Sequence, residues 1–189
     1  PGVDRNVRWL RETHGDRVRL AIADIRNREA VEDAVREAAQ VFHFAAQVAV
    51  TTSLVDPVGD FAINAGGTLN VLEAIRACPV PPPLVFTSTN KVYGGLEDVP
   101  LSLQGARYAP AAGDVAAGGI GESRALDFHS PYGCSKGTAD QYVRDYARSY
   151  GIPTVVFRMS CIYGPHQFGT EDQGWLAHFL IRALDGDEI

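Results

Sequence analysis

Leu84-Val85-Phe86-Thr87-Ser88 is a short apolar run that does not alternate with polar residues, a pattern that predicts a strand buried on both faces. Before it, residues 61–78 repeat apolar positions at spacings of three and four, which predicts a helix that the proline-rich residues 79–83 end. A long irregular stretch follows the strand, and residues 132–150 then predict a second helix with Gly151 as its C-terminal cap. The middle of the chain therefore alternates between strand and helix.

The same alternation continues on both sides of this region. Apolar runs at 18–22, 41–46 and 153–159 predict three more strands, and residues 28–39 and 175–184 predict two more helices. Apolar strands separated by helices are typical of a parallel sheet with helices on both faces. We therefore expect an α/β fold with a doubly wound, Rossmann-like parallel sheet.

Ligands of such sheets bind beyond the carboxyl ends of the strands. The functional residues are therefore expected directly after Ala23, Phe44, Thr87 and Met159, where the predicted strands end.

The composition is that of an ordinary globular protein, with 46% hydrophobic and 21% charged residues in 189. The net charge of −6 and the absence of any Lys/Arg run argue against a nucleic-acid partner. No stretch reaches the roughly 18 consecutive apolar residues of a membrane span, so we expect no membrane partner. Cys78, Cys134 and Cys161 form no CxxC pair, which favours free thiols in a reducing, cytoplasmic environment.

Tyr132 and Lys136 are four residues apart at the start of a predicted helix, a spacing that places both side chains on one helical face. A phenol with a pKa of about 10 is a poor base at neutral pH. A neighbouring ammonium group and the positive helix N-terminus both stabilise the phenolate, so this pair could take a proton from a hydroxyl group. Residues 87–94 add a hydroxyl group at a strand end, and the glycines of 64–68 allow backbone to approach a ligand closely.

Together these motifs resemble the extended short-chain dehydrogenase/reductase family, the NAD-dependent sugar-nucleotide epimerases and dehydratases. The resemblance extends over nearly the whole chain, and the motifs occur in the family's order. They are Asp24-Ile25, Phe44-Ala45-Ala46, Asn64-x-x-Gly67-Thr68, Ser88-Thr89, the Tyr132/Lys136 pair and residues 158–165. The resemblance implies NAD as the cofactor, a nucleotide-sugar substrate and a homo-oligomer.

The resemblance also implies a role for each site residue. Tyr132 would be the catalytic base, Lys136 would lower its pKa and hold the nicotinamide ribose, and Thr89 would hydrogen-bond the reacting substrate oxygen. The candidate cofactor-binding residues are Asp24, Ile25, Phe44, Ala45, Ala46, Asn64, Thr87, Ser88, Tyr132, Lys136, Met159 and Ile162. The candidate substrate-binding residues are Gln47, Thr51, Asn90, His129, Cys161 and Gln167.

Four stretches, 47–53, 88–94, 126–137 and 167–175, resemble the 2-epimerases of CDP-sugars within this family. A CDP-sugar is therefore the preferred substrate, epimerised through transient oxidation at C2. A 4-epimerase of UDP-sugars is the nearest enzymatic alternative. A 4,6-dehydratase is disfavoured, because Asn90-Lys91 stands where dehydratases usually carry Asp-Glu. A non-catalytic NAD(P)-binding module is disfavoured too, because such relatives generally lack the tyrosine.

Two departures from the family pattern stand out. The glycine-rich GxxGxxG loop is absent, and the chain starts at Pro1 and stops at Ile189 just after a helical pattern. We therefore expect a fragment that lacks the first strand or strands and most of the C-terminal substrate domain. Residues 1–165 would form a partial NAD-binding, Rossmann-like domain, and residues 166–189 would begin the substrate-binding region. Cys161 stands where many relatives have Asn, so substrate anchoring at this position stays open.

Other features have ordinary structural explanations. His43 lies inside an apolar strand and is expected to be a satisfied core or strand-end histidine. The Ala/Gly-rich residues 109–121 predict a flexible surface loop, with a lid over the substrate as the alternative. Glu171, Asp172 and His178 have no metal-ligand spacing, so no metal site is expected.

Overall fold

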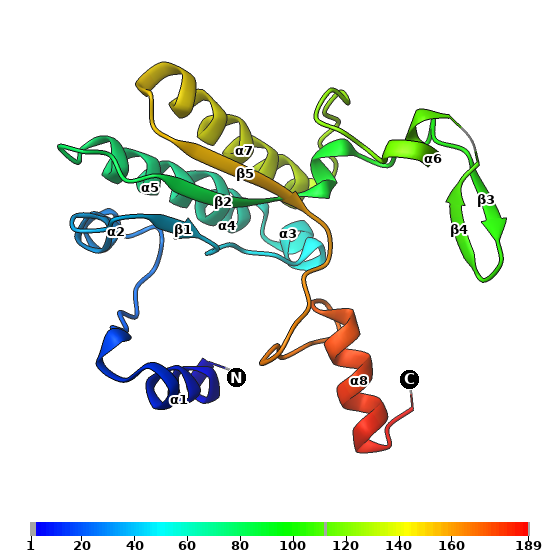
Figure 1. Ribbon diagram of the computed structural model, residues 1–189, viewed down its shortest axis with the longest axis horizontal. Helices are drawn as coiled ribbons and strands as arrows, with labels where there is room; N and C mark the ends of the chain where they lie inside the picture. The colour runs from blue at the N-terminus through cyan, green and yellow to red at the C-terminus, as the bar shows by residue number, and fades with distance from the viewer. Residues whose placement is uncertain (1–2, 112, 189) are drawn as a thin grey trace.

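The centre of the fold is a three-stranded parallel sheet in the order β1-β2-β5. The computed structural model describes residues 3–111 and 113–188 (Figure 1). Strand β1 (Val41–His43) pairs with β2 (Leu84–Thr89), and β2 pairs along its whole length with β5 (Thr154–Met159). The predicted α/β fold with a parallel, Rossmann-like sheet is confirmed.

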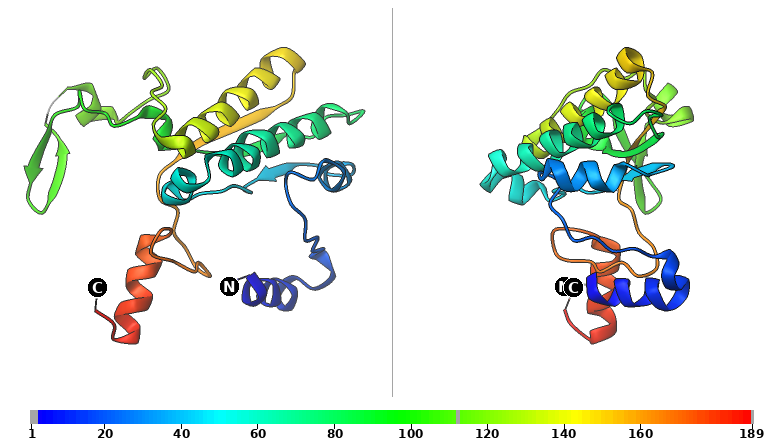
Figure 2. Two further views of the ribbon diagram at one scale, coloured as in Figure 1. Left: turned by 180° about the vertical axis from the view of Figure 1, so that it is seen from behind. Right: turned by 90° about the vertical axis from the view of Figure 1, so that its left-hand side faces the viewer.

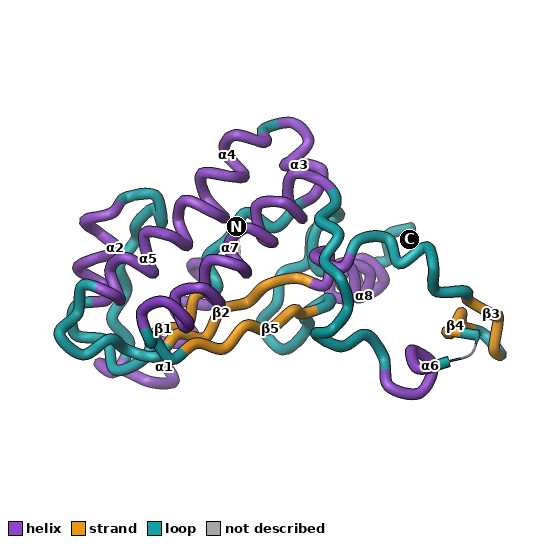
Figure 3. The backbone as a smooth tube through the Cα atoms, turned by 90° about the horizontal axis from the view of Figure 1, so that it is seen from above, coloured by secondary structure: helices purple, strands orange, loops and turns teal. Residues whose placement is uncertain are grey.

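Three helices cover one face of this sheet: α2 (Arg28–Val35), α5 (Gly67–Arg76) and α7 (Ser130–Tyr150). Figure 3 shows them together on one side of the strands. Between helices and sheet lies an apolar core that includes Leu72, Ile75, Leu84, Phe86 and Val143, each at most 1% exposed. The candidate site lies next to this core, at the N-terminal end of α7.

The other face of the sheet differs from the expectation. We predicted helices on both faces, but Phe42, Val155 and Phe157 are 58%, 48% and 50% exposed. Their side chains alternate with core-facing residues along β1 and β5, as the two-residue period of a strand requires. Within the described residues, the helices therefore cover one side only.

The predicted strand at 18–22 is wrong. This run is irregular in the structure, and the side chain of Ile22 is 93% exposed. A strand needs a neighbour to satisfy its backbone groups, and among the described residues β1 pairs only with β2. Helix α1 (Val3–His14) and a short 3₁₀ turn, η1 (Gly15–Arg17), precede this run and were not predicted.

The helix predicted over 61–78 begins earlier and contains an irregularity. It starts as α4 (Pro57–Phe61), passes through the π-helical turn η2 (Ala62–Gly66) and continues as α5. Asp56 caps its start by accepting a hydrogen bond of 2.9 Å from the Gly59 N–H. Single π-helical turns within helices are frequent at functional sites, and this one contains Asn64.

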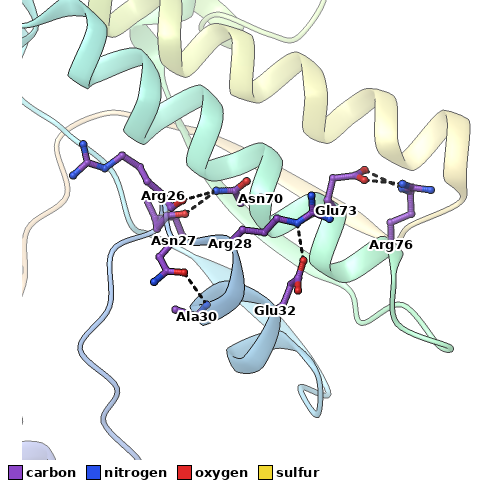
Figure 4. A network of polar contacts seen from close by, with 9 residues as sticks. Arg26, Asn27, Arg28, Ala30, Glu32, Asn70, Glu73 and Arg76 are labelled. Atoms are coloured by element: carbon purple, nitrogen blue, oxygen red, sulfur yellow. Dashed lines mark hydrogen bonds and ion pairs between the residues drawn. The ribbon is translucent and has the colours of Figure 1, made fainter.

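Polar contacts join the loop before α2 to α5 (Figure 4). Asn70 donates from Nδ2 to the carbonyl oxygens of Ile25 (3.2 Å) and Arg26 (3.3 Å). Asn27 caps α2 by accepting from the Ala30 N–H at 3.3 Å. The loop that contains the candidate cofactor residue Ile25 is therefore held on α5.

The stretch between β2 and α7 is more ordered than the sequence predicts. It contains an antiparallel hairpin, β3 (Leu101–Gln104) and β4 (Arg107–Pro110), followed by α6 (Asp114–Gly118). Figures 1 and 2 show the hairpin extending away from the three-stranded sheet. The part of 109–121 that the structure describes therefore belongs to a projecting arm that contains the end of β4 and α6.

The last helix, α8 (Trp175–Asp185), confirms the predicted helix at 175–184. The loop before it contacts the loop after β1 and the short helix α3 (Val50–Val55). Gln173 donates from Nε2 to the Val48 carbonyl at 2.7 Å, and Thr51 donates to Asp172 at 3.1 Å. Two stretches that the sequence singled out together, 47–53 and 167–175, therefore touch.

Candidate active site

Strand β2 and helix α7 meet at the carboxyl edge of the sheet. The strand ends at Thr89, whose Oγ1 accepts from the Lys91 N–H at 3.2 Å and starts the 3₁₀ turn η3 (Asn90–Tyr93). Helix α7 starts at Ser130, which has a φ of 66° and accepts from the Gly133 N–H at 3.2 Å. Pro131 follows, in a position that favours a helix start. This start places Tyr132 in the first turn of α7.

Tyr132 lies against Thr89, as predicted. The Thr89 hydroxyl acts to lower the pKa of the phenol. Burial has a larger effect in the opposite direction, and the Asp60 carboxylate adds to it, so the pKa of Tyr132 is raised. We expected Lys136 to lower this pKa, and the net shift in the protein alone is upward. A further positive charge near the phenol is needed to make it a base at neutral pH.

Lys136 is buried, with 4% of its surface exposed. Its Nζ donates to the Thr87 carbonyl at 2.6 Å and lies 4.3 Å from the centroid of the Phe86 ring. Burial lowers the pKa of Lys136 to about 8, against the opposing charges of Asp140 and Asp60. An ammonium group has three N–H donors, and within the described chain only one of them has a partner.

Asn64 joins the loop after β1 to the helices. Its Oδ1 accepts from the Gln47 N–H at 2.9 Å, and its Nδ2 donates to the Gln47 carbonyl at 3.0 Å. The same Nδ2 lies 3.1 Å from Oδ1 of Asp60 and 3.0 Å from Oγ of Ser135. Asn64 is 1% exposed, so these contacts form inside the protein.

His43 has the core position expected for it. It is 4% exposed, and its Nε2 is 2.9 Å from Oγ1 of Thr68. Burial, with a smaller effect of the Lys136 charge, lowers its pKa to about 4. His43 is therefore a neutral, hydrogen-bonded core residue.

Several other predicted site residues lie at the surface around this edge. Asp24 is paired with Arg26 at 2.6 Å, which holds the pKa of its carboxyl at about 2. Gln167 donates from Nε2 to the Ile162 carbonyl at 3.0 Å. The remaining exposed members are Phe44, Ala45, Thr51, Asn90, His129, Met159, Cys161 and Ile162, and Ala46 is partly exposed.

An open cavity of about 670 Å³ lies beside η3. Tyr93 is in its wall, together with Asp127 and His129 from the segment that leads into α7. Of the predicted substrate-binding residues, His129 thus faces a space large enough for a small ligand. No group of three or more His, Cys, Asp or Glu residues in the described part of the chain could hold a metal ion.

The residues of the strand end also fit a polar cofactor. Oγ of Ser88 is buried and has no hydrogen-bond partner among the described residues. An unpaired buried hydroxyl group is costly, so a partner from outside the chain is expected at this position. The spare donors of Lys136 lead to the same conclusion.

Three residues of the site were not predicted. Asp60 and Ser135 are each 2% exposed and hydrogen-bond to one another. Ser53 accepts from the Tyr132 N–H at 3.2 Å and donates to the Val50 carbonyl at 2.7 Å. The sequence does hold a signal for Asp60, which precedes Asn64 by four residues and so shares its helical face.

A scan against protein-family models matches residues 2–189 to the "NAD dependent epimerase/dehydratase family". The chain belongs to the NAD dependent epimerase/dehydratase family. The predicted resemblance to the extended short-chain dehydrogenases/reductases is thereby confirmed.

Relatives of this chain within the NAD dependent epimerase/dehydratase family include both epimerases and dehydratases. The chain is 45% identical to CDP-paratose 2-epimerase of Salmonella typhi over 186 residues, 97% of this chain and 54% of the relative. Its fold is similar to a crystal structure of UDP-glucose 4-epimerase from Thermus thermophilus in complex with NAD, with a TM-score of 0.70 and 35% identity over 88% of this chain and 49% of that one.

The third comparison is with a double mutant of the dTDP-glucose 4,6-dehydratase DesIV from Streptomyces venezuelae, with NAD and DAU bound. The TM-score is 0.72 and the identity 26%, over 97% of this chain and 49% of that one. The chain spans about half the length of the curated relatives it matches. In the described residues no helix is both long and apolar enough to cross a membrane.

Proposed function

We propose that the full-length protein is an NAD-dependent sugar-nucleotide epimerase that interconverts CDP-paratose and CDP-tyvelose. The observation that carries the reaction class is the placement of Tyr132 beside Thr89, and of Lys136 beside Thr87, where the end of β2 meets α7. The 45% identity to a CDP-paratose 2-epimerase over 97% of this chain supports the choice of substrate.

The three residues have separate tasks in this proposal. Tyr132 takes the proton of the sugar C2 hydroxyl, and Thr89, which lies beside the phenol, hydrogen-bonds that oxygen. Bound NAD⁺ supplies the redox chemistry by accepting and returning a hydride at C2. Lys136 holds the nicotinamide ribose with its spare N–H donors, and its proposed second task is to oppose the upward shift that burial gives the pKa of Tyr132.

The remaining predicted residues surround this centre. Residues 1–165 form part of the NAD-binding domain, where Ser88 offers its unpaired hydroxyl group to the cofactor. Residues 166–189 begin the substrate-binding region, whose loop touches 47–53 through the Gln173–Val48 contact. The proposed substrate is a CDP-sugar, and the cavity beside His129 is proposed to accept part of it.

A UDP-sugar 4-epimerase is the second candidate, because the same catalytic residues serve oxidation at C4 and the fold is similar to such an enzyme with NAD. A 4,6-dehydratase is disfavoured. The residues after Thr89 are Asn90 and Lys91, which supply no carboxylic acid to help a hydroxyl group leave as water. A cytoplasmic location, supported by the three free cysteines, and a homo-oligomer complete the proposal.

The test is a substrate assay on the purified full-length protein without added NAD⁺. Incubation with CDP-paratose should yield CDP-tyvelose, seen by ¹H NMR, because the cofactor returns to its starting state in each cycle. Turnover of UDP-glucose or UDP-galactose alone would assign the protein to the 4-epimerases. Release of a 4-keto-6-deoxy sugar from dTDP-glucose would assign it to the dehydratases.

A further inference from the structure

A buried carboxylate lies beneath the first two turns of α7. Asp60 is 2% exposed, and no arginine among the described residues pairs with it. Its Oδ2 accepts from Oγ of Ser135, and its Oδ1 accepts from Nδ2 of Asn64 at 3.1 Å. Ser135 is adjacent to Lys136 in sequence and three residues after Tyr132, so Asp60 contacts the helix between the two candidate catalytic side chains.

The hydrogen bond from Ser135 to Asp60 depends on whether Asp60 is ionised. The Ser135 hydroxyl has one proton and two acceptors in reach, Asp60 and the Tyr132 carbonyl oxygen at 3.2 Å. While Asp60 is ionised, it is the stronger acceptor and takes that proton. If Asp60 is protonated or becomes an amide, the bond to Ser135 weakens, and the serine proton is free to turn towards the backbone of Tyr132.

We infer that Asp60 is a positioning residue of this site, whose buried carboxylate holds the first turns of α7 through Ser135 and Asn64. The inference rests on the proposed function, because it gives Asp60 its purpose through Tyr132 and Lys136.

The surrounding charges support this assignment. The groups that face Lys136 are Asp60, Asp140 on the same helix and His43 on β1, and the two carboxylates act to raise its pKa while burial lowers it. Asp60 also acts to raise the pKa of Tyr132, which Thr89 opposes. Loss of the Asp60 charge should therefore move the pKa of both Tyr132 and Lys136 downward.

The test compares two aspartates of one helix. Asp60→Asn removes the buried charge and keeps the shape of the side chain. Asp56→Asn makes the same charge change four residues earlier, at the exposed cap of α4, where Asn caps as well as Asp. The readouts are the ¹³Cζ signal of Tyr132 and the ¹³Cε signal of Lys136 in the full-length protein, assigned with Tyr132→Phe and Lys136→Arg. Lys136 and Lys91 are the only lysines of this sequence.

In Asp60→Asn, both titration midpoints should fall by about one pH unit, the scale on which a neighbouring charge acts. In Asp56→Asn they should stay in place. Ser135→Ala keeps the charge and removes the link, so it should lower kcat by about tenfold without moving the midpoints. Midpoints that do not move in Asp60→Asn would overturn the inference.

The pH dependence of kcat is the second readout of this test. Both limbs of the kcat–pH profile should move to lower pH in Asp60→Asn, whereas a purely structural role would lower kcat and leave the limbs in place. If Asp60→Asn does not fold, the test uses NMR of the wild-type protein. The Tyr132 and Lys136 signals should then shift as Asp60 titrates at acidic pH. Signals that do not change over this pH range would overturn the inference. A wild-type protein that epimerises no nucleotide sugar would remove the proposed function, while the titrations would still decide the role of Asp60.

Discussion

The backbone N–H of Tyr132 donates a hydrogen bond of 3.2 Å to Oγ of Ser53, which lies 79 residues earlier in α3. N–H groups in the first turn of a helix have no partner within that helix, and here a serine from another helix supplies one. The position of Tyr132 is thus fixed through its backbone and does not depend on its phenol. The hydroxyl group can be removed without disturbing the start of α7.

We therefore expect Tyr132→Phe in the full-length protein to fold and to retain NAD. Its kcat should fall by about 10²–10⁴-fold, the usual contribution of general acid–base catalysis, with little change in substrate affinity. Steady-state kinetics and cofactor content measure both. Tyr142→Phe, on the exposed side of the same helix, is the control and should match the wild type. Near-normal turnover in Tyr132→Phe would reduce the tyrosine to a packing residue.

His43 should make the protein sensitive to acid. Its pKa is lowered from 6.5 to about 4 by burial, so the unfolded chain binds its proton more readily than the folded one. Stability is then lost as the pH falls from 6.5 towards 4, by about 2 kcal/mol at pH 5 relative to pH 7. His43→Gln, which retains a partner for Thr68, should remove this part of the pH dependence in urea unfolding. His14→Gln, at an exposed position, should leave it intact.

The ion pair of Asp140 and Arg158 should be costly to break. Asp140 is fully buried and accepts two hydrogen bonds of 2.9 Å from Arg158, whose third bond goes to the Tyr93 hydroxyl. Arg158→Ala leaves a buried carboxylate unpaired, and we expect it to lower the free energy of unfolding by about 3–5 kcal/mol.

The matched control is Arg36→Ala, which breaks an exposed pair with Asp33. That change should cost less than about 1 kcal/mol. Equal effects of the two substitutions in urea denaturation would show that the Asp140 pair contributes nothing special.

Gly137 should not tolerate a side chain. A Cβ there would lie 2.5 Å from the ring of Phe128, which precedes α7. Gly137→Ala should therefore destabilise the protein by about 1–3 kcal/mol, and Phe128→Leu should partly restore stability. Gly118→Ala, where nothing lies within 4 Å, should be nearly neutral. Thermal unfolding of the three variants checks this, and a stable Gly137→Ala would contradict the packing described.

The sequence was most informative where local pattern and burial agree. Residues 84–88 are apolar because β2 is the central, mostly buried strand of the sheet, and Pro131 and Gly151 mark the ends of α7 through their backbone preferences. The run at 18–22 has the same composition, but a strand also depends on a neighbour, which a local pattern does not reveal. The hairpin in 101–110 was missed because its side chains are mostly exposed and show little alternation.

The candidate site divides in the same way. Tyr132 and Lys136 were found because their spacing occurs together with the other motifs of the family. Ser53, Asp60 and Ser135 act through contacts between segments 75 or more residues apart. The direction of the shift in the Tyr132 pKa was not predictable from spacing, because burial and Asp60 outweigh the effect of the Thr89 hydroxyl. The burial of Tyr132 follows from the tertiary structure, which the spacing of residues in the sequence does not reveal.

Gly67 and Ile25 form a matched pair in size. A Cβ at position 67 would lie 2.6 Å from Cγ2 of Ile25, so the absence of a side chain on α5 makes the space that the isoleucine fills. A larger residue at either position therefore requires a smaller residue at the other. Over evolutionary time the two positions should therefore vary together, and a relative with alanine at 67 should have a smaller residue at 25. The residues allowed at position 25 of this loop therefore depend on position 67, which lies 42 residues later in a helix.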